Sequence, residues 1–305
     1  MGAVAIMARH GHAPVGPAAG CRDHSREGSH EMPSIAATPG RGAILRVGLI
    51  GFGSIGKPVA QAVLDGVIGP AVLTGILRAR PTEPGAPAGV PVVTDIQELL
   101  ATNPHVVVET GGHAALRAYG EAVLQAGCDL MTISVGALAD DALLAALETA
   151  GAAAGSRLLI PSGAIAGLDM LNAARLAGLE HVRHTVRKPP AALLPTDEAA
   201  AVIASGQPRQ LYEGIAREAT RRFPENVNVV AAVSLSGIGM DRTIARVVAD
   251  PTVTHNTHEV EASGAFGTLR IEVRNVPGSN PKTGVIVASS VIRALQRLRA
   301  TVVLG

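Results

Sequence analysis

Aromatic side chains are scarce in this chain of 305 residues, which has no tryptophan, two tyrosines and three phenylalanines. Proteins that bind single-stranded nucleic acid stack bases on aromatic rings, and this sequence offers few rings for that purpose. The formal net charge is only +1, from 26 basic and 25 acidic side chains. The chain therefore also lacks the basic excess that polyanion binding requires, and we expect no nucleic-acid partner.

Cysteine is almost absent, and Cys21 and Cys128 lie far apart in the sequence. Two such cysteines provide neither a disulfide framework nor the ligand spacing of a metal site, so we expect no metal. Their small number is typical of a reducing compartment, which predicts a cytoplasmic protein. No uninterrupted apolar run approaches the roughly 20 residues that a membrane helix needs. The start of the chain is also a poor secretory signal, so we expect no membrane partner.

Apolar residues make up 47% of the chain, which is enough for a sizeable core. The length predicts two domains, with one large α/β domain as the alternative. Residues 1–42 are rich in Gly, Pro, Ser and His without any period, and we interpret them as a disordered extension. In residues 43–166, short β-branched runs alternate with helical stretches of ten or more residues. This alternation is typical of an α/β domain with a Rossmann-type doubly wound parallel sheet, which binds dinucleotides.

The pattern changes in residues 167–276, where several segments alternate with period 2. In GTLRIEVRNV, for example, Leu269, Ile271 and Val273 share one face. Such alternation predicts half-buried strands of a mostly antiparallel sheet. With helices near 167–177 and 209–222, this segment is predicted to be a second α+β domain for substrate and catalysis.

The last segment, 277–305, contains a helical pattern with apolar residues at Val287, Val291 and Leu295. These three positions share one face of a helix. We expect this helix to return and pack on the dinucleotide-binding domain.

A glycine-rich turn lies between the first predicted strand and a helical pattern. Gly51, Gly53 and Gly56 have the spacing G-x-G-x-x-G. In this context the first glycine permits a tight turn, the second lets backbone approach a pyrophosphate, and the third lets the helix pack closely. We predict that these glycines, with Ser54 and Ile55, hold a dinucleotide at the helix N-terminus. The alternative is a glycine turn with a purely structural role.

The second predicted strand ends in ILRAR, without the acidic residue that binds the ribose 2′-hydroxyl of NAD. Arg78 and Arg80 stand there instead. A guanidinium group suits the 2′-phosphate of NADP, although arginines at a solvated loop end would look the same. We therefore expect NAD or NADP as cofactor, with Arg78 in its site and NADP accepted at least as well as NAD.

Several longer motifs occur together and in order, and they resemble the L-aspartate dehydrogenase family. They include VGLIGFGSIGKPV, VVVETGGHAAL, TISVGALAD, LLIPSGAIAGLDML, RHTVRKPP, FPENVNVVAAVSLSGIGMDRT, HEVEASGAFG and SNPKTG. The resemblance covers nearly all of residues 44–300. It implies NAD(P)-dependent oxidation of L-aspartate to iminoaspartate, with hydride transfer to C4 of the nicotinamide. The imine would then hydrolyse to oxaloacetate and ammonia or supply NAD biosynthesis, and the family implies a cytoplasmic homodimer.

The resemblance also implies roles for individual residues. The catalytic histidine of the family falls on His258, and the chemistry needs a group with a near-neutral pKa to move the amine proton. His255 lies on the opposite strand face and is expected to be exposed. Ala164 in PSGAIAG and Asn228 in PENVN match the NAD-contact positions. Helix packing for Ala164 and a helix cap for Asn228 are the structural alternatives.

Aspartate carries two carboxylates, so its site should contain cations or anion-binding backbone. Four candidates stand beside proline-containing turns, and the sequence does not choose among them: Arg187, Lys188, Lys282 and Thr283.

Glu109 and His113 are further candidates, for the nicotinamide side of the site.

Two other functions fit parts of the pattern. An enzyme similar to dihydrodipicolinate reductase or homoserine dehydrogenase would share the nucleotide-binding domain and a mixed second domain. A nucleotide-sensing protein without turnover would keep the glycine turn but would need neither His258 nor cations for carboxylates. Oxidation of L-aspartate, of homoserine or of neither separates these functions.

Overall fold

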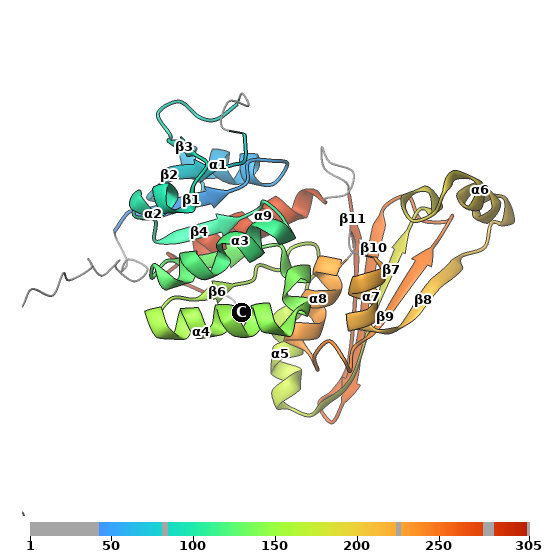
Figure 1. Cartoon of the computed structure of the whole chain (residues 1–305). Coiled ribbons are helices and arrows are strands. Elements are labelled where there is room, and N and C mark those ends of the chain that lie inside the picture. The colour runs from blue at the N-terminus through green and yellow to red at the C-terminus, as the bar shows by residue number, and fades with distance from the viewer. Residues whose placement is uncertain (1–42, 81–84, 224–226, 277–283, 304–305) are drawn as a thin grey trace, which may run out of the picture. The chain divides into compact units, whose positions relative to one another are not determined.

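The computed structural model describes residues 43–80, 85–223, 227–276 and 284–303, all within one compact unit, Ile35–Gly305 (Figure 1). The strands of its first lobe are β1 (Leu45–Ile50), β2 (Ala71–Leu77), β3 (Val92–Val93), β4 (Val106–Glu109), β5 (Asp129–Thr132) and β6 (Leu158–Leu159). Among the described residues they form a six-stranded parallel sheet in the order β3-β2-β1-β4-β5-β6. The strand order reverses between β1 and β4, which is where open α/β sheets bind ligands.

Helices cover both faces of this sheet, which explains why its strands are apolar without alternation. The helices are α1 (Gly56–Leu64), α2 (Ile96–Ala101), α3 (His113–Gln125), α4 (Asp141–Ala154) and α9 (Val285–Arg297). On one face, Val59 and Val63 of α1 pack with Val291 and Leu295 of α9. Leucines of α2, α3 and α4 cover the other face. The C-terminal helix therefore lies against the first lobe.

The second lobe contains a mixed sheet. Its strands are β7 (Leu179–Lys188), β8 (Arg209–Ile215), β9 (Ile244–Ala249), β10 (Asn256–Gly264) and β11 (Gly267–Asn275). In the described part of the chain their order is β11-β10-β7-β9-β8, and β7 and β9 are the one parallel pair. Because side chains alternate along each strand, one face of this sheet faces helices and the pocket, and the other carries charged side chains.

The second lobe also contains four α-helices in the part of the chain that the structure describes. They are α5 (Leu168–Leu176), α6 (Thr196–Ser205), α7 (Ala216–Arg222) and α8 (Val227–Ser236). Helix α8 packs against both β7 and the short 3-10 helix η1 (Val135–Ala139) of the first lobe. Its residues Val230, Ala231 and Val233 are buried, as expected for a helix that is apolar nearly all round. One continuous apolar core thus runs from the first lobe into the second.

The predicted fold class is confirmed, with differences in the second lobe. The helix predicted over 209–222 is wrong in its first half, because residues 209–215 form the strand β8 and pair with β9. Tyr212 is buried there, and Glu213 pairs with Arg246 across the strands. Edge pairing of this kind depends on tertiary contacts that a local pattern does not contain. Helices α6 and α8 were not predicted.

The predicted disordered extension, 1–42, lies outside the described residues. None of the helices that the structure describes is long and apolar enough to cross a membrane.

Candidate active site

The glycine turn between β1 and α1 makes close contacts that only glycine allows. Gly51 has a φ of +89°, and a Cβ atom there would lie 2.7 Å from the amide nitrogen of Gly111. A Cβ atom on Gly56 would lie 2.5 Å from the carbonyl oxygen of Gly51. A Cβ atom on Gly53 would meet no described atom within 4 Å. The fold itself therefore needs Gly51 and Gly56, whereas Gly53 keeps space open outside the turn.

The open side of this turn fits a pyrophosphate. Helix α1 begins at Gly56. In its first turn the amides of Lys57 and Val59 donate to the carbonyls of Gly53 and Ile55, so an anion at this end would be held by the amides of residues 53–56 that precede them. Ser54 and Ile55 complete the turn, and Ile55 also lines the pocket described below. The residues present at the turn thus fit the diphosphate of a dinucleotide.

Positive charge surrounds Phe52, which lies in the glycine turn after β1. The guanidinium carbon of Arg78 lies 5.8 Å from the centre of the Phe52 ring, and Nζ of Lys57 lies 5.9 Å from it. Arg78 is the first residue after β2 and is largely buried, whereas Arg80 is exposed. Arg78 therefore occupies the position at which an acidic residue would bind the ribose of NAD. Lys57 was not among the predicted cofactor residues.

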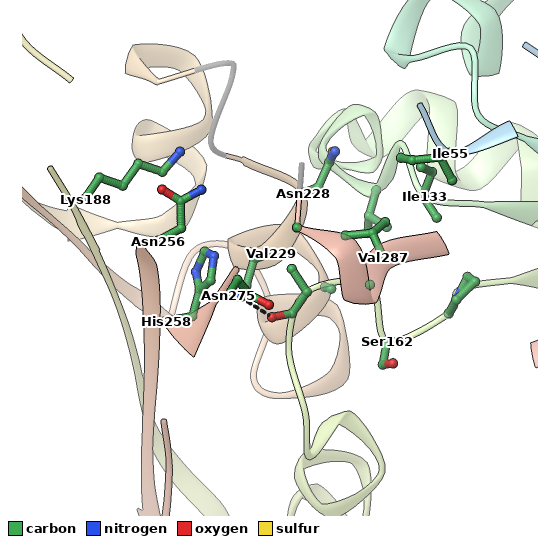
Figure 2. A pocket seen from close by; sticks show the side chains of 16 residues that line it. Ile55, Ile133, Ser162, Lys188, Asn228, Val229, Asn256, His258, Asn275 and Val287 are labelled. Atoms are coloured by element: carbon green, nitrogen blue, oxygen red, sulfur yellow. Dashed lines mark hydrogen bonds between the residues drawn. The ribbon is translucent and has the colours of Figure 1, made fainter. Parts of the chain in front are cut away.

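A pocket lies where the carboxyl ends of the first sheet face the second sheet (Figure 2). Figure 2 shows Ile55, Ile133 and Ser162 on one side, from segments that follow β1, β5 and β6. Lys188 and His258 lie across the pocket, on strands of the second sheet. The pocket therefore has a largely apolar wall from the first lobe and a polar wall from the second.

Strand register brings the polar groups of the pocket together. Thr257 of β10 pairs with Arg187 of β7, so Asn256 and Lys188 come next to each other at the strand ends. Because side chains alternate, Lys188, Asn256 and His258 all face the pocket. An ammonium group, a carboxamide and an imidazole thus share one face of the sheet.

His258 is a buried imidazole with a second imidazole behind it. Its exposure is 6%, and its Nδ1 lies 3.1 Å from Nε2 of His184 on β7. Burial is the largest cause that lowers the pKa of His258 well below 6.5, and the nearby His184 and Lys188 lower that pKa further. The hydrogen bond uses Nδ1, so Nε2 is the ring nitrogen left for a ligand. At neutral pH this residue is an uncharged imidazole, the form that accepts a proton.

Ala164 and Asn228, the predicted cofactor contacts, both line the pocket. The carbonyl oxygen of Ala164 accepts a hydrogen bond of 2.9 Å from Nδ2 of Asn275, which fixes the loop after β6 to β11. Oδ1 of Asn228 accepts hydrogen bonds from the amide of Gly136, at 2.8 Å, and from Nε2 of His113, at 2.9 Å. Asn228 is the second residue of α8, so the helix-cap alternative does not apply.

The structure does not bring the substrate-binding candidates together. Lys188 lines the pocket, but Arg187 points to the other face of β7, where it pairs with Glu259 at 2.6 Å and with Asp250 at 3.3 Å. The physical reason is strand alternation, because neighbouring residues face opposite sides. Lys282 and Thr283 lie outside the described residues.

Glu109, proposed for the nicotinamide side, is instead fully buried at the end of β4. Its carboxylate accepts hydrogen bonds from Thr132, at 2.6 Å, and from the amide of Gly112, at 2.8 Å. Burial raises its pKa, while these hydrogen bonds oppose the rise. Glu109 therefore organises the loops beside β4 and β5. In the described part of the chain, no group of three His, Cys, Asp or Glu side chains is placed to hold a metal ion.

Three further polar residues belong to this site and were not predicted from the sequence: His184, Asn256 and Asn275. The sequence contains a signal for the first two. His184 and Lys188 are four residues apart in a segment with period 2, and Asn256 and His258 are two apart in another. Each pair therefore shares one strand face.

Comparison with known proteins agrees with this geometry. The family described as "Aspartate dehydrogenase, C-terminal" matches residues 169–298. L-aspartate dehydrogenase 2 of Bordetella bronchiseptica is 39% identical over 85% of this chain and 99% of its own. The L-aspartate dehydrogenase of Pseudomonas aeruginosa is 38% identical over 83% of this chain and 97% of its own.

The chain belongs to the L-aspartate dehydrogenase family. The crystal structure of aspartate dehydrogenase from Thermotoga maritima has the same architecture, with a TM-score of 0.70 and 26% identity, over 86% of this chain and 99% of that one. An amine dehydrogenase from Mycobacterium smegmatis shares the fold, with a TM-score of 0.52 at 14% identity, over 84% of this chain and 93% of that one.

The two lobes of this member of the aspartate dehydrogenase family match different family models. Residues 51–161 match the family described as "Homoserine dehydrogenase, NAD binding domain", which agrees with the glycine turn and makes the first lobe an NAD(P)-binding domain. That lobe alone does not separate aspartate from homoserine dehydrogenases. The second lobe does, because its match is to aspartate dehydrogenase.

Alanine at Gly53 and at Gly56 should have different effects. Gly53→Ala should leave the melting temperature unchanged and weaken NADPH binding about tenfold, or ~1.4 kcal/mol, because a methyl group would occupy space that the pyrophosphate needs. Gly56→Ala should lower stability by about 1–3 kcal/mol through its overlap with the Gly51 carbonyl. Fluorescence titration and thermal melts measure both. Wild-type affinity in Gly53→Ala would contradict the assignment.

Proposed function

We propose that this protein oxidises L-aspartate to iminoaspartate, with hydride transfer to C4 of the nicotinamide of NAD(P)⁺ and His258 as the acid–base group. The observation that carries the proposal is the position of His258. It is uncharged, lies beside Lys188, and faces a pocket that is also lined by Ala164 of the NAD(P)-binding lobe. Membership of the family supports the choice of substrate.

Lys188 and Asn256 are the groups that we assign to the substrate carboxylates. An ammonium group makes charge-assisted hydrogen bonds to a carboxylate, and a carboxamide donates through its NH₂ group. Both side chains lie at the ends of paired strands, next to His258. A four-carbon diacid held by them would place its amino group near the imidazole. Arg187 has no part in this arrangement, because its partners are on the other face.

The reaction then needs one proton transfer from the substrate before hydride leaves. L-aspartate enters with an ammonium group, which must lose a proton so that the nitrogen lone pair can form the C=N bond. Nε2 of His258 takes that proton. A bound nicotinamide, for which Ala164 and Asn228 line the pocket, would supply the acceptor for the hydride of Cα. Loss of hydride from the neutral amine leaves an iminium group, C=NH₂⁺. Water adds to its carbon and loses one proton to solvent, and His258 returns its proton to the nitrogen. Ammonia then departs as the new hydroxyl loses its proton to solvent and becomes the carbonyl of oxaloacetate.

For the cofactor we propose that NADP is used at least as well as NAD. Arg78 supports this proposal by its place after β2, and Lys57 adds a second cation on the same ring of Phe52. The 2′-phosphate carries a charge that these cations would stabilise.

We further propose that the enzyme is a cytoplasmic homodimer. Its product, iminoaspartate, either hydrolyses to oxaloacetate and ammonia or is used in NAD biosynthesis. The family resemblance supports the dimer and the pathway, and the small number of cysteines supports the compartment. We also propose the division into a dinucleotide-binding domain at 43–166, a catalytic domain at 167–276 and a returning C-terminal segment at 277–305. The two sheets and the contact of α9 with α1 support that division.

His258→Ala should reduce kcat with L-aspartate by about 10²–10⁴-fold, the usual contribution of a positioned acid–base group. The Kd for NADH should not change, because the glycine turn is distant in the sequence and belongs to the other lobe. Absorbance at 340 nm with L-aspartate, homoserine or no substrate gives the measurement. Turnover of homoserine alone, or no turnover by the wild type, would reject the proposal, as would a His258→Ala variant with normal kcat.

The neighbours Lys188 and Arg187 provide a matched pair for the carboxylate assignment. Lys188→Met should raise KM for L-aspartate about 10–100-fold, since a charge-assisted hydrogen bond contributes about 1.5–3 kcal/mol. Arg187→Met should change KM by less than about threefold, because its side chain lies on the other face. Initial rates at saturating cofactor decide the matter. An equal rise in both variants would contradict the assignment.

Arg78→Ala should raise KM for NADP about tenfold or more, through loss of one charged contact. KM for NAD should change much less, because NAD lacks the 2′-phosphate. The comparison is made with L-aspartate saturating, and Arg80→Ala serves as the exposed counterpart. A wild-type enzyme with a strong preference for NAD would refute the NADP proposal.

A further inference from the structure

A second histidine lies behind His258 and has no part in the function proposed so far. His184 on β7 has 1% exposure, and its Nε2 lies 3.1 Å from Nδ1 of His258 on β10. The two rings are nearly parallel, with an angle of 15° between their planes and 5.3 Å between their centres. The contact therefore fixes the plane of the catalytic ring as well as one of its nitrogens.

This hydrogen bond carries one proton, and its position decides what His258 can do. If His184 donates, His258 carries its own proton on Nε2 and presents an N–H to the pocket. If His258 donates from Nδ1, its Nε2 presents a lone pair to the pocket. Only the second arrangement allows His258 to accept a proton from the substrate. In each arrangement both rings are neutral.

The surroundings of His184 keep it neutral. It borders a small, mostly apolar cavity with Val186 and Phe223, and Arg246 is the other ionisable residue there. Burial lowers the pKa of His184 to about 4. At neutral pH, then, His184 is not a cation and can accept a proton through Nε2.

Charge at the pocket end selects between the two arrangements. Lys188 lies beside His258 there and acts on it through its positive charge. An N–H on Nε2 would bring its positive end near the ammonium group of Lys188, which disfavours this arrangement. A lone pair on Nε2 is attracted by the same positive charge, which favours the other arrangement. Among the described residues, the ionisable groups that act on His258 are His184 and Lys188 of β7. Residues of α8, β11 and the loop after β6 that line the described pocket are uncharged.

We propose that His184 is a positioning residue that accepts the Nδ1 proton of His258 and thereby holds Nε2 unprotonated toward the substrate. This inference rests on the proposed function of His258. A buried carboxylate often has this role behind a catalytic or metal-binding histidine. A neutral imidazole differs from it, because it orients the ring without stabilising the imidazolium. The base therefore stays neutral until a substrate with two carboxylates arrives.

Two substitutions at His184 separate orientation from packing. His184→Gln can place its side-chain oxygen near the position of Nε2 and should keep kcat/KM within about threefold of wild type, because the acceptor remains. His184→Leu removes the acceptor and should lower kcat/KM at least about tenfold through kcat, with Kd for NADH unchanged. His181→Leu is the control, because this histidine is on the same strand but exposed; it should behave as wild type.

Nitrogen-15 NMR of histidine-labelled full-length protein gives a readout that a structural role would not move. We expect the Nδ1–H tautomer for His258 in the wild type and in His184→Gln, and an Nε2–H form in His184→Leu, with His258→Ala used for assignment. An Nε2–H tautomer in the wild type would overturn the inference. So would equal losses in the Gln and Leu variants with equally lowered melting temperatures. The tautomer is measured without turnover, so a wild type inactive on L-aspartate would refute the function separately.

Discussion

The alternation of side chains along β7 and β10 is the constraint on which the site depends. Each residue of a strand faces the side opposite to its neighbours. One face therefore carries Lys188 and His258 to the pocket, while Arg187 and Glu259 pair on the other face. A shift of one residue in either strand would turn that strand's pocket residue to the other face and separate Lys188 from His258. The antiparallel register between Thr257 and Arg187 therefore determines which side chains face the pocket, as well as how the strands pair.

The pKa of His258 should depend on whether a negatively charged ligand is bound. In the free protein, burial and Lys188 disfavour a positive charge on His258 and lower its pKa. Two carboxylates placed beside Lys188 would reverse that influence, because an opposite charge within about 4–6 Å favours the charged form by 1–3 pKa units. The base would thus become stronger when a diacid binds. A substrate with one carboxylate would supply less of this effect.

Much of the fold was readable from the sequence because it rests on local signals. Alternating strands and helices predicted the parallel sheet, and period 2 predicted the second sheet. Strand β8 was misread because its partner, β9, comes some 30 residues later, and edge pairing leaves little trace in a local pattern. Helix α8 was missed because it is apolar nearly all round and so has no clear stripe.

The site was predicted less evenly, for a related reason. The glycine turn is contiguous, and His258, Ala164 and Asn228 came from the family resemblance. Arg187 and Lys188 could not be distinguished by composition, because both are cations beside the same prolines. They are separated by strand phase, and this phase was set by residues such as His184 and Val186 on the buried face. His184 was inside a quoted motif, but its partner is 74 residues away.

Contacts between the lobes fix the walls of the pocket in the free protein. Asn275 donates a hydrogen bond to the carbonyl of Ala164, and Asn228 accepts one from the amide of Gly136. The second lobe is therefore hydrogen-bonded to two segments of the first. Ser290 of α9 accepts a hydrogen bond from the amide of Gly163, next to Ala164. The loop after β6 is thus held from both sides. Because hydride transfer requires the donor carbon and the ring to meet in one geometry, a loop fixed in this way lowers the ordering cost of each turnover.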